Sequence, residues 1–167
     1  MLRLLRRPFT PEEARALASW AYPPPLDLYD ADRDSPDLFV ARDPDGGGYY
    51  PAVDDDGTVV AFAVVGAEAR VRGQEPADEV VDVGMGVRPD VTSSGLGTAL
   101  VGQVLDLARE LGGTSARAAV AVFNERSLAL CRSAGFRPVR DFTGPGGRTF
   151  RELALPLGDE DFVPAQS

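Results

Sequence analysis

The sequence lacks several residue types on which common protein chemistry depends. It contains no histidine among its 167 residues, and its only cysteine is Cys131. Histidine is the usual general base and metal ligand, and an internal disulfide or a cysteine-based metal cluster needs more than one cysteine. We therefore expect no metal site and no disulfide. A proton acceptor, if the protein uses one, must be a carboxylate or water.

Long hydrophobic stretches are also missing. No apolar run approaches the roughly 20 residues that a membrane-spanning helix needs. Residues 1–8 carry charge and are not followed by a long apolar region, which is not typical of a signal peptide. We therefore expect a cytoplasmic protein that does not bind a membrane.

Positive charge is scarce and comes from arginine alone, because the sequence has no lysine. The net charge is −9 and the pI is near 4.5. Binding to nucleic-acid phosphates requires a basic face, so we expect no nucleic-acid partner. An acidic surface instead favours a basic amine as ligand, although the charge inside the binding pocket decides.

Local signals divide the chain into alternating strands and helices. At this length we expect one domain over residues 1–157, followed by an acidic flexible tail over residues 158–167. Capping residues, glycines and apolar periodicity predict the elements in between. In chain order these are a strand within 2–8, a helix after Thr10, a hairpin of 49–53 and 58–66, a strand over 80–87, a helix over 96–111, a strand over 116–123, a helix over 125–134, and a hairpin of 136–142 and 148–155. The order predicts an α/β fold in which helices cover both faces of a mixed sheet.

Residues 80–111 form the stretch around which the chain is organised. An apolar strand stops at Arg88-Pro89. The side chains of Thr92, Ser93 and Ser94 then offer N-cap oxygens. Gly95 and Gly97 bracket the start of an amphipathic helix. The first N–H groups of a helix lack intrahelical partners, its dipole makes that end electropositive, and glycines let an anion approach closely. The stretch therefore predicts a phosphate site, although the same glycines could serve the turn and helix packing alone. It matches neither a P-loop nor a dinucleotide-binding fingerprint.

Two motifs carry a resemblance to a known family. They are V-R-P-D-V-T-S-S-G-L-G-T-A-L at residues 87–100 and F-N-E-R-S-L-A-L-C-R-S-A-G-F at residues 123–136. With this order of elements, they resemble the GNAT superfamily of acyl-CoA-dependent N-acetyltransferases. The resemblance implies a GNAT-like α/β fold whose sheet is mixed, mostly antiparallel and twisted.

The activity that the resemblance implies is acetyl transfer from acetyl-CoA to a primary amine. The amine would attack directly in a ternary complex, the acceptor would be a small molecule or the N-terminus of a peptide or protein, and the enzyme would be a monomer or homodimer. The alternative is a domain that binds acyl-CoA without catalysis, for example as a sensor.

The same resemblance implies a set of cofactor-binding residues. The strand before the turn would pair with the pantetheine arm, the turn and helix start would hold the pyrophosphate, and an asparagine would bind the cofactor arm. These residues are Met85, Gly86, Val87, Thr92, Ser93, Ser94, Gly95, Leu96, Gly97, Thr98 and Asn124. Thr92 is a departure, because the family usually has glutamine or arginine there.

Three residues are candidates for the chemistry. The N–H of Val87 would stabilise the oxyanion. Asp82 would share one strand face with Gly84 and Gly86, which leave room for a ligand, and could accept the proton of the amine; alternatively it binds water or an arginine. Cys131 stands where the family often has a tyrosine that acts as the general acid. It either protonates the departing thiolate or belongs to the core.

Residues 22–29 form a loop because three consecutive prolines exclude a helix there. Tyr22, Asp27 and Tyr29 lie on this loop. They could form one wall of an acceptor pocket, or the tyrosines could instead cap the core.

Overall fold

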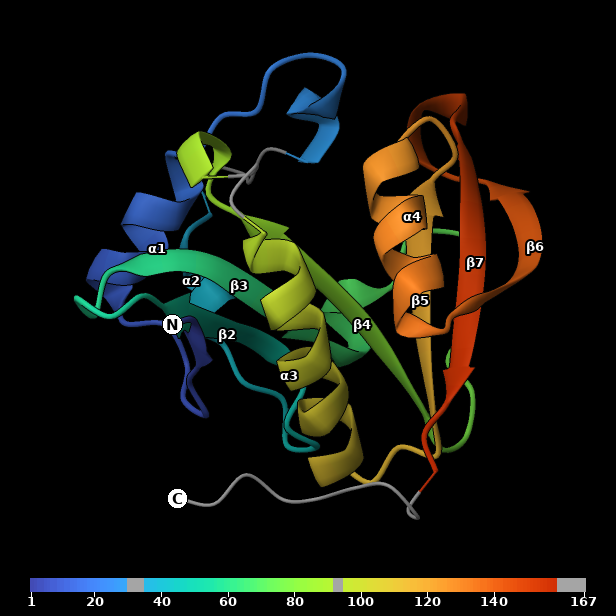
Figure 1. The fold of residues 1–167 in the computed structure, drawn as a ribbon, viewed down its shortest axis with the longest axis horizontal. Coiled ribbons are helices and arrows are strands. Elements are labelled where there is room, and N and C mark those ends of the chain that lie inside the picture. Colours follow the sequence, from blue (N-terminus) through green and yellow to red (C-terminus); the bar gives the residue numbers. More distant parts are fainter. Residues whose placement is uncertain (30–34, 92–94, 159–167) are drawn as a thin grey trace.

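The computed structural model, which describes residues 1–29, 35–91 and 95–158 and only the backbone of residues 28 and 29, has a seven-stranded sheet at its centre (Figure 1). The strand order is β1-β2-β3-β4-β5-β7-β6, and every neighbouring pair is antiparallel except β4–β5. The strands are β1 (Arg3–Leu4), β2 (Gly48–Val53), β3 (Val59–Val65), β4 (Val80–Val87), β5 (Ser115–Ala121), β6 (Arg137–Thr143) and β7 (Thr149–Pro156). This confirms the mixed, mostly antiparallel sheet.

The helices begin and end largely where local signals place them. They are α1 (Pro11–Ala18), α2 (Asp37–Val40), α3 (Leu96–Glu110) and α4 (Glu125–Ala134), with 3-10 turns at Leu26–Tyr29, Gly66–Ala69, Pro89–Val91 and Pro145–Gly147. Thr10 and Glu13 form a reciprocal capping box at α1. Asn124 Oδ1 accepts a hydrogen bond from the N–H of Ser127 (3.3 Å) at the start of α4. Gly135 ends α4 in the left-handed conformation (φ 101°).

The start of α3 differs from the expectation. Its N-cap is Gly95, in the left-handed conformation (φ 81°), and no side chain caps it. Glycine tolerates that backbone conformation, which other residues rarely adopt. Thr92, Ser93 and Ser94, which were expected to offer capping oxygens, lie outside the described residues.

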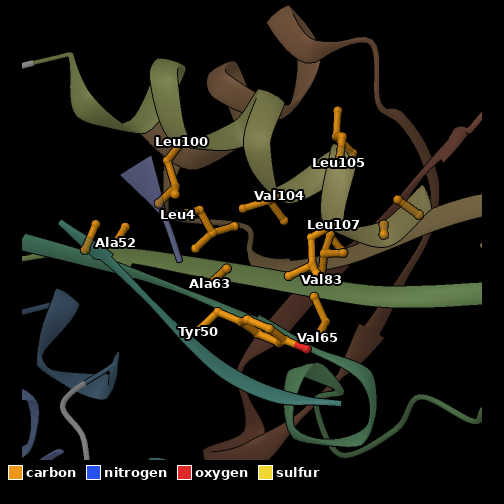
Figure 2. Packing of buried hydrophobic residues seen from close by; sticks show 14 of the residues in the cluster. Leu4, Tyr50, Ala52, Ala63, Val65, Val83, Leu100, Val104, Leu105 and Leu107 are labelled. Atoms are coloured by element: carbon orange, nitrogen blue, oxygen red, sulfur yellow. The ribbon is translucent and has the colours of Figure 1, made fainter. Parts of the chain in front are cut away.

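Helices cover both faces of the sheet, as the sequence predicts. Leu100, Val104 and Leu107 of α3 pack over the sheet, with Leu128 of α4 in the same cluster (Figure 2). The opposite face carries a smaller cluster in which α1 and Phe39 of α2 pack against Tyr49 and neighbouring aromatic rings. The alternation of β2 and β3 side chains between the two clusters follows from the two-residue period of a strand.

The sheet opens in its middle. β4 and β5 pair over only three residue pairs, from Val80–Ser115 to Asp82–Arg117, whereas β4 stays paired with β3 up to Val87–Ala61. Beyond Asp82 the two parallel strands diverge (Figure 1). The second half of β4 therefore has a partner strand on one side only. We call the space between the diverging strands the splay.

Two further expectations concern membrane-spanning helices and the C-terminal tail. No helix within the described ranges is both long and apolar enough to cross a bilayer. The expected acidic tail lies outside the described residues from 159 onward, so the division into a domain and a tail stays a prediction.

Candidate functional site

The backbone of β4 directs hydrogen-bonding groups into the splay. The N–H of Arg88 donates to the carbonyl of Val60 on β3 (2.8 Å), which makes Arg88 and Val60 a hydrogen-bonded pair. Such pairs alternate along an antiparallel ladder, so Gly86 also directs its N–H and carbonyl toward β3. Val87 and Met85 consequently direct theirs toward the splay.

The three β4 residues that the resemblance assigns to the cofactor differ in the direction of their backbone groups. Met85 and Val87 present backbone donors and acceptors where an extended ligand could pair as an added strand. Gly86 was expected to do the same, but its backbone groups belong to the ladder with Phe62.

Gly86 instead makes room for an aromatic ring. A Cβ atom at this position would lie 2.5 Å from Cε1 of Phe62. Phe62 in turn contacts Trp20, with ring centroids 6.2 Å apart. The ring of Phe62 therefore fills the space that was expected to be open beside Gly86. Through its contact with Trp20, this ring also holds the segment that follows α1.

Trp20 thereby places the proline-rich loop at the end of β4. The hydroxyl of Tyr22 donates a hydrogen bond to the carbonyl of Val87 (2.8 Å). Of the three expected acceptor-wall residues, Tyr22 is thus beside the splay. Asp27 is exposed on the 3-10 turn, and the side chain of Tyr29 lies outside the described atoms.

The N-terminus of α3 has the properties of an anion seat. The N–H groups of Leu96, Gly97 and Thr98 lack intrahelical partners because they lie in the first turn. The first turn itself contains no acidic residue that would neutralise the positive end of the dipole.

The two glycines at this helix start have different roles. A Cβ at Gly95 would meet no atom within 4 Å, so space does not require glycine there. The left-handed φ of this residue does. A Cβ at Gly97 would lie 3.3 Å from Cδ2 of Leu130 and 3.6 Å from Cε of Met85. Gly97 therefore lets α3 approach α4 and the floor of the splay closely. Space, backbone donors and dipole together fit a phosphate group.

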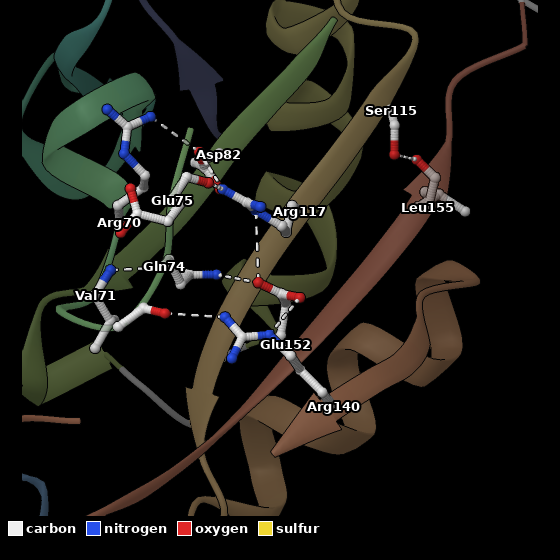
Figure 3. A network of polar contacts seen from close by, with 11 residues as sticks. Arg70, Val71, Gln74, Glu75, Asp82, Ser115, Arg117, Arg140, Glu152 and Leu155 are labelled. Carbon is white, nitrogen blue, oxygen red and sulfur yellow. Dashed lines mark hydrogen bonds and ion pairs between the residues drawn. The ribbon is translucent and has the colours of Figure 1, made fainter. Parts of the chain in front are cut away.

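Asp82 is buried in an ion-pair network on the face of the sheet away from α3 (Figure 3). Arg117 binds it through two nitrogens, Nε to Oδ1 (2.6 Å) and Nη2 to Oδ2 (3.1 Å), and Arg70 Nη1 adds a third contact to Oδ2 (3.2 Å). The Asp82 side chain is 2% exposed. Both oxygens are thus occupied by guanidinium donors, which favours the interpretation in which an arginine binds Asp82 over its use as a base.

The network continues to Glu152 on β7. Burial raises the pKa of Glu152, but hydrogen bonds from Gln74 and Arg140 and the charges of Arg140 and Arg117 outweigh it and hold this pKa below its usual range. The hydrogen bond to Asp82 similarly raises the pKa of Arg117. Glu152 and Arg117 are thus charged at neutral pH. The network joins β4, β5, β6 and β7 at the closed end of the splay.

Cys131 is half-buried on α4 and packs against the main core. Burial raises the pKa of its thiol from 9.0 to about 11. Proton transfer from such a thiol to a departing thiolate of ordinary pKa is uphill. The contacts and the pKa both favour a core role over that of the acid.

This assignment gives the first testable prediction. Cys131 should react slowly with thiol reagents at pH 8, with and without CoA, and its reactivity should rise toward pH 11. The folded pKa lies above the unfolded one, so the unfolded state releases the proton first and stability should fall between pH 9 and 11. Urea unfolding of wild type and Cys131→Ala across this range measures the difference. Rapid labelling at pH 8 that CoA prevents would instead indicate the acid role.

Sequence reasoning missed the partners that define this site. Nothing local in the sequence links Arg117 or Arg70 to Asp82, or Trp20 to Phe62, because these pairs depend on strand register or on the placement of a loop. Among the described residues, no cluster of three or more potential metal ligands occurs.

A protein-family model described as "Acetyltransferase (GNAT) family" matches residues 4–136. No curated protein matches the chain.

Solved structures share the fold along nearly the whole chain. The ribosomal-protein-alanine N-acetyltransferase of Brucella melitensis has a TM-score of 0.71 at 20% identity, over 94% of this chain and 99% of its own. An acetyltransferase candidate from Salmonella typhimurium, solved with its cofactor acetyl-CoA, has a TM-score of 0.70 at 19% identity, over 99% of each chain. An aminoglycoside acetyltransferase in complex with coenzyme A has a TM-score of 0.72 at 17% identity, over 93% of this chain and 95% of its own.

Proposed function

The chain belongs to the GNAT family of acetyltransferases, and from this premise we propose that it transfers the acetyl group of acetyl-CoA to a primary amine. The amine attacks directly, in a complex that holds both substrates. The acceptor is a small molecule or the N-terminus of a peptide or protein.

The splay carries this proposal. It joins two features that acyl transfer from a CoA thioester needs: an anion seat at the start of α3, and backbone groups of Met85 and Val87 that face the open space. A pantetheine arm that pairs with Met85 and Val87 extends from a pyrophosphate held at Gly95 to Thr98. Thr92, Ser93 and Ser94 remain proposed members of the same seat.

Acetyl-CoA supplies an acyl group that is already activated as a thioester. The residues of the chain bind and orient the two substrates and stabilise the charge that develops during transfer. The N–H of Val87 faces the splay and stabilises negative charge on the carbonyl oxygen. The hydroxyl of Tyr22 donates to the carbonyl of the same residue, so the N–H is the group that Val87 offers to the ligand.

The proton of the amine leaves through water in this proposal. Asp82 is engaged by Arg117 and Arg70, and the pKa of Cys131 is raised by burial, so neither is well suited to proton transfer. Orientation alone can contribute several kcal/mol, and a weak acceptor is then sufficient.

Asn124 has two roles in the proposal. Its Oδ1 caps α4 through Ser127, and the amide NH₂ of the same side chain is a donor that suits a carbonyl of the pantetheine arm.

The test is a turnover screen with a binding measurement. We expect calorimetry to show CoA binding, and thiol release from acetyl-CoA with at least one class of primary amine above an amine-free control. Cys131 contributes at most one thiol per chain, a constant background. No binding at millimolar CoA would contradict the proposal.

The second candidate is a domain that binds acyl-CoA without turnover. The occupied carboxylate of Asp82 and the buried thiol of Cys131 favour it, since neither serves readily as acid or base. The same screen separates the two candidates, because a sensor binds CoA and releases no thiol with any amine.

A further inference from the structure

A groove lined by arginines opens on the face of the sheet that is turned away from α3 and α4. Its volume is about 590 Å³. Arg70, Val71 and Arg72 form one wall, and Arg148, Phe150 and the hairpin turn at 145–146 form the other. The two walls meet closely, since a Cβ at Gly144 would lie 3.3 Å from Cγ1 of Val71.

The charge of this groove is opposite to that of the protein as a whole. The chain carries a net charge of −9, yet the lining residues include three arginines and no carboxylate. Arg70 uses Nη1 for Asp82 and is 26% exposed. Within the described ranges, neither the side chain of Arg72 nor that of Arg148 has a hydrogen bond or ion pair. Guanidinium groups without a carboxylate partner in a concave surface attract anions and bind carboxylate or phosphate in a forked geometry.

The groove lies behind the splay. Arg70 reaches the β4 residue Asp82, where the strands begin to diverge, and Phe150 pairs with Ala121 at the far end of β5. Asp82 points to the face opposite the α3-packed residues Val81 and Val83. The anion seat and Asn124 lie at the starts of α3 and α4, so acetyl-CoA bound as proposed occupies that side of the splay and leaves the rear face to the second substrate.

We propose that the arginine groove binds an anionic group of the acceptor, so that the acceptor is an amine that also carries a carboxylate or phosphonate. This inference rests on the proposed acetyl transfer and adds a substrate class to it. It also replaces the expectation, drawn from net charge, of a purely basic amine, because the local charge is positive.

The test compares matched amines. With saturating acetyl-CoA, kcat/KM is measured by thiol release for ω-amino acids of two to five carbons, for aminoalkylphosphonates, and for n-alkylamines and diamines of equal length, which lack an anionic group. We expect at least a tenfold preference for an amine with an anionic group over its match without one. Arg72→Gln and Arg148→Gln should each reduce this preference severalfold and leave turnover of the amines without an anionic group unchanged. Arg137→Gln, which removes the same charge from an exposed position at the opposite end of β6, should leave the preference intact.

A binding measurement separates failure of the inference from failure of acetyl transfer. Calorimetry with 3-aminopropylphosphonate and CoA-saturated protein should show binding that Arg72→Gln and Arg148→Gln weaken. Such binding without turnover of any amine keeps the anion site and rejects the transfer reaction. If alkylamines or diamines turn over as fast as their matches with an anionic group, the anion site is rejected and the reaction is kept. Weaker CoA binding in the two variants, without a change in acceptor preference, would assign the groove to the cofactor and overturn the inference.

Discussion

Gly97→Asp should abolish CoA binding at millimolar concentration, a loss of at least 100-fold that calorimetry can measure. The substitution places a carboxylate in the first turn of α3, where the phosphate is expected. Two unit charges about 4 Å apart repel each other by about 4 kcal/mol at the effective dielectric of a protein surface. The added Cβ would also lie 3.3 Å from Leu130, so the contact between α3 and α4 must loosen slightly.

The same substitution should leave the fold intact, which makes the result interpretable. An acidic side chain near a helix N-terminus interacts favourably with the dipole, and aspartate has a higher helix propensity than glycine. We therefore expect a melting temperature close to that of wild type.

Gly102→Asp is the matched control, because it adds the same charge to α3 where a Cβ meets no atom within 4 Å. It should bind CoA as wild type does. Equal affinity of Gly97→Asp and Gly102→Asp would show that the phosphate does not lie at the start of α3.

The elements that were predictable from the sequence are those that depend on local signals. Thr10 with Glu13, and Asn124 with Gly135, define α1 and α4 through bonds within a few residues of each other. The spacing of Leu100, Val104 and Leu107 predicts the buried face of α3, and these residues lie in the core. Where a turn depends on backbone conformation, as at Gly95, side-chain capping rules gave the wrong N-cap.

The parts of the site that were not predictable depend on strand register and loop placement. The direction of each β4 backbone group follows from a single bond, Arg88 to Val60, that no local pattern encodes. The packing of Phe62 over Gly86 and of Trp20 on Phe62 joins segments far apart in the sequence. Net charge in particular is misleading for the arginine groove, because long-range folding gathers cations from two separate loops in an acidic chain.

The two interpretations of Asp82 are decided by stability and turnover measured together. As a base, Asp82→Asn would slow turnover and leave stability unchanged. As the centre of a buried ion pair, it would leave Arg117 without its closest counter-ion, and such a loss typically costs 3–5 kcal/mol. Glu152, 3.7 Å from Arg117, compensates in part. We therefore expect a loss near the lower end, about 3 kcal/mol.

Asp82→Asn should accordingly lower the urea midpoint strongly, while the shape of the pH–rate profile of the folded fraction stays that of wild type. Asp141→Asn is the control, because Asp141 pairs with Arg151 on an exposed strand and such pairs contribute little. The wild-type network should also weaken in acid: the pKa of Glu152 is depressed in the folded state, so its contribution is complete above the unfolded pKa and is lost as pH falls through the folded one. If Asp82→Asn unfolds at the wild-type urea concentration but loses the acidic limb of its rate profile, Asp82 accepts the proton and the ion pair is secondary.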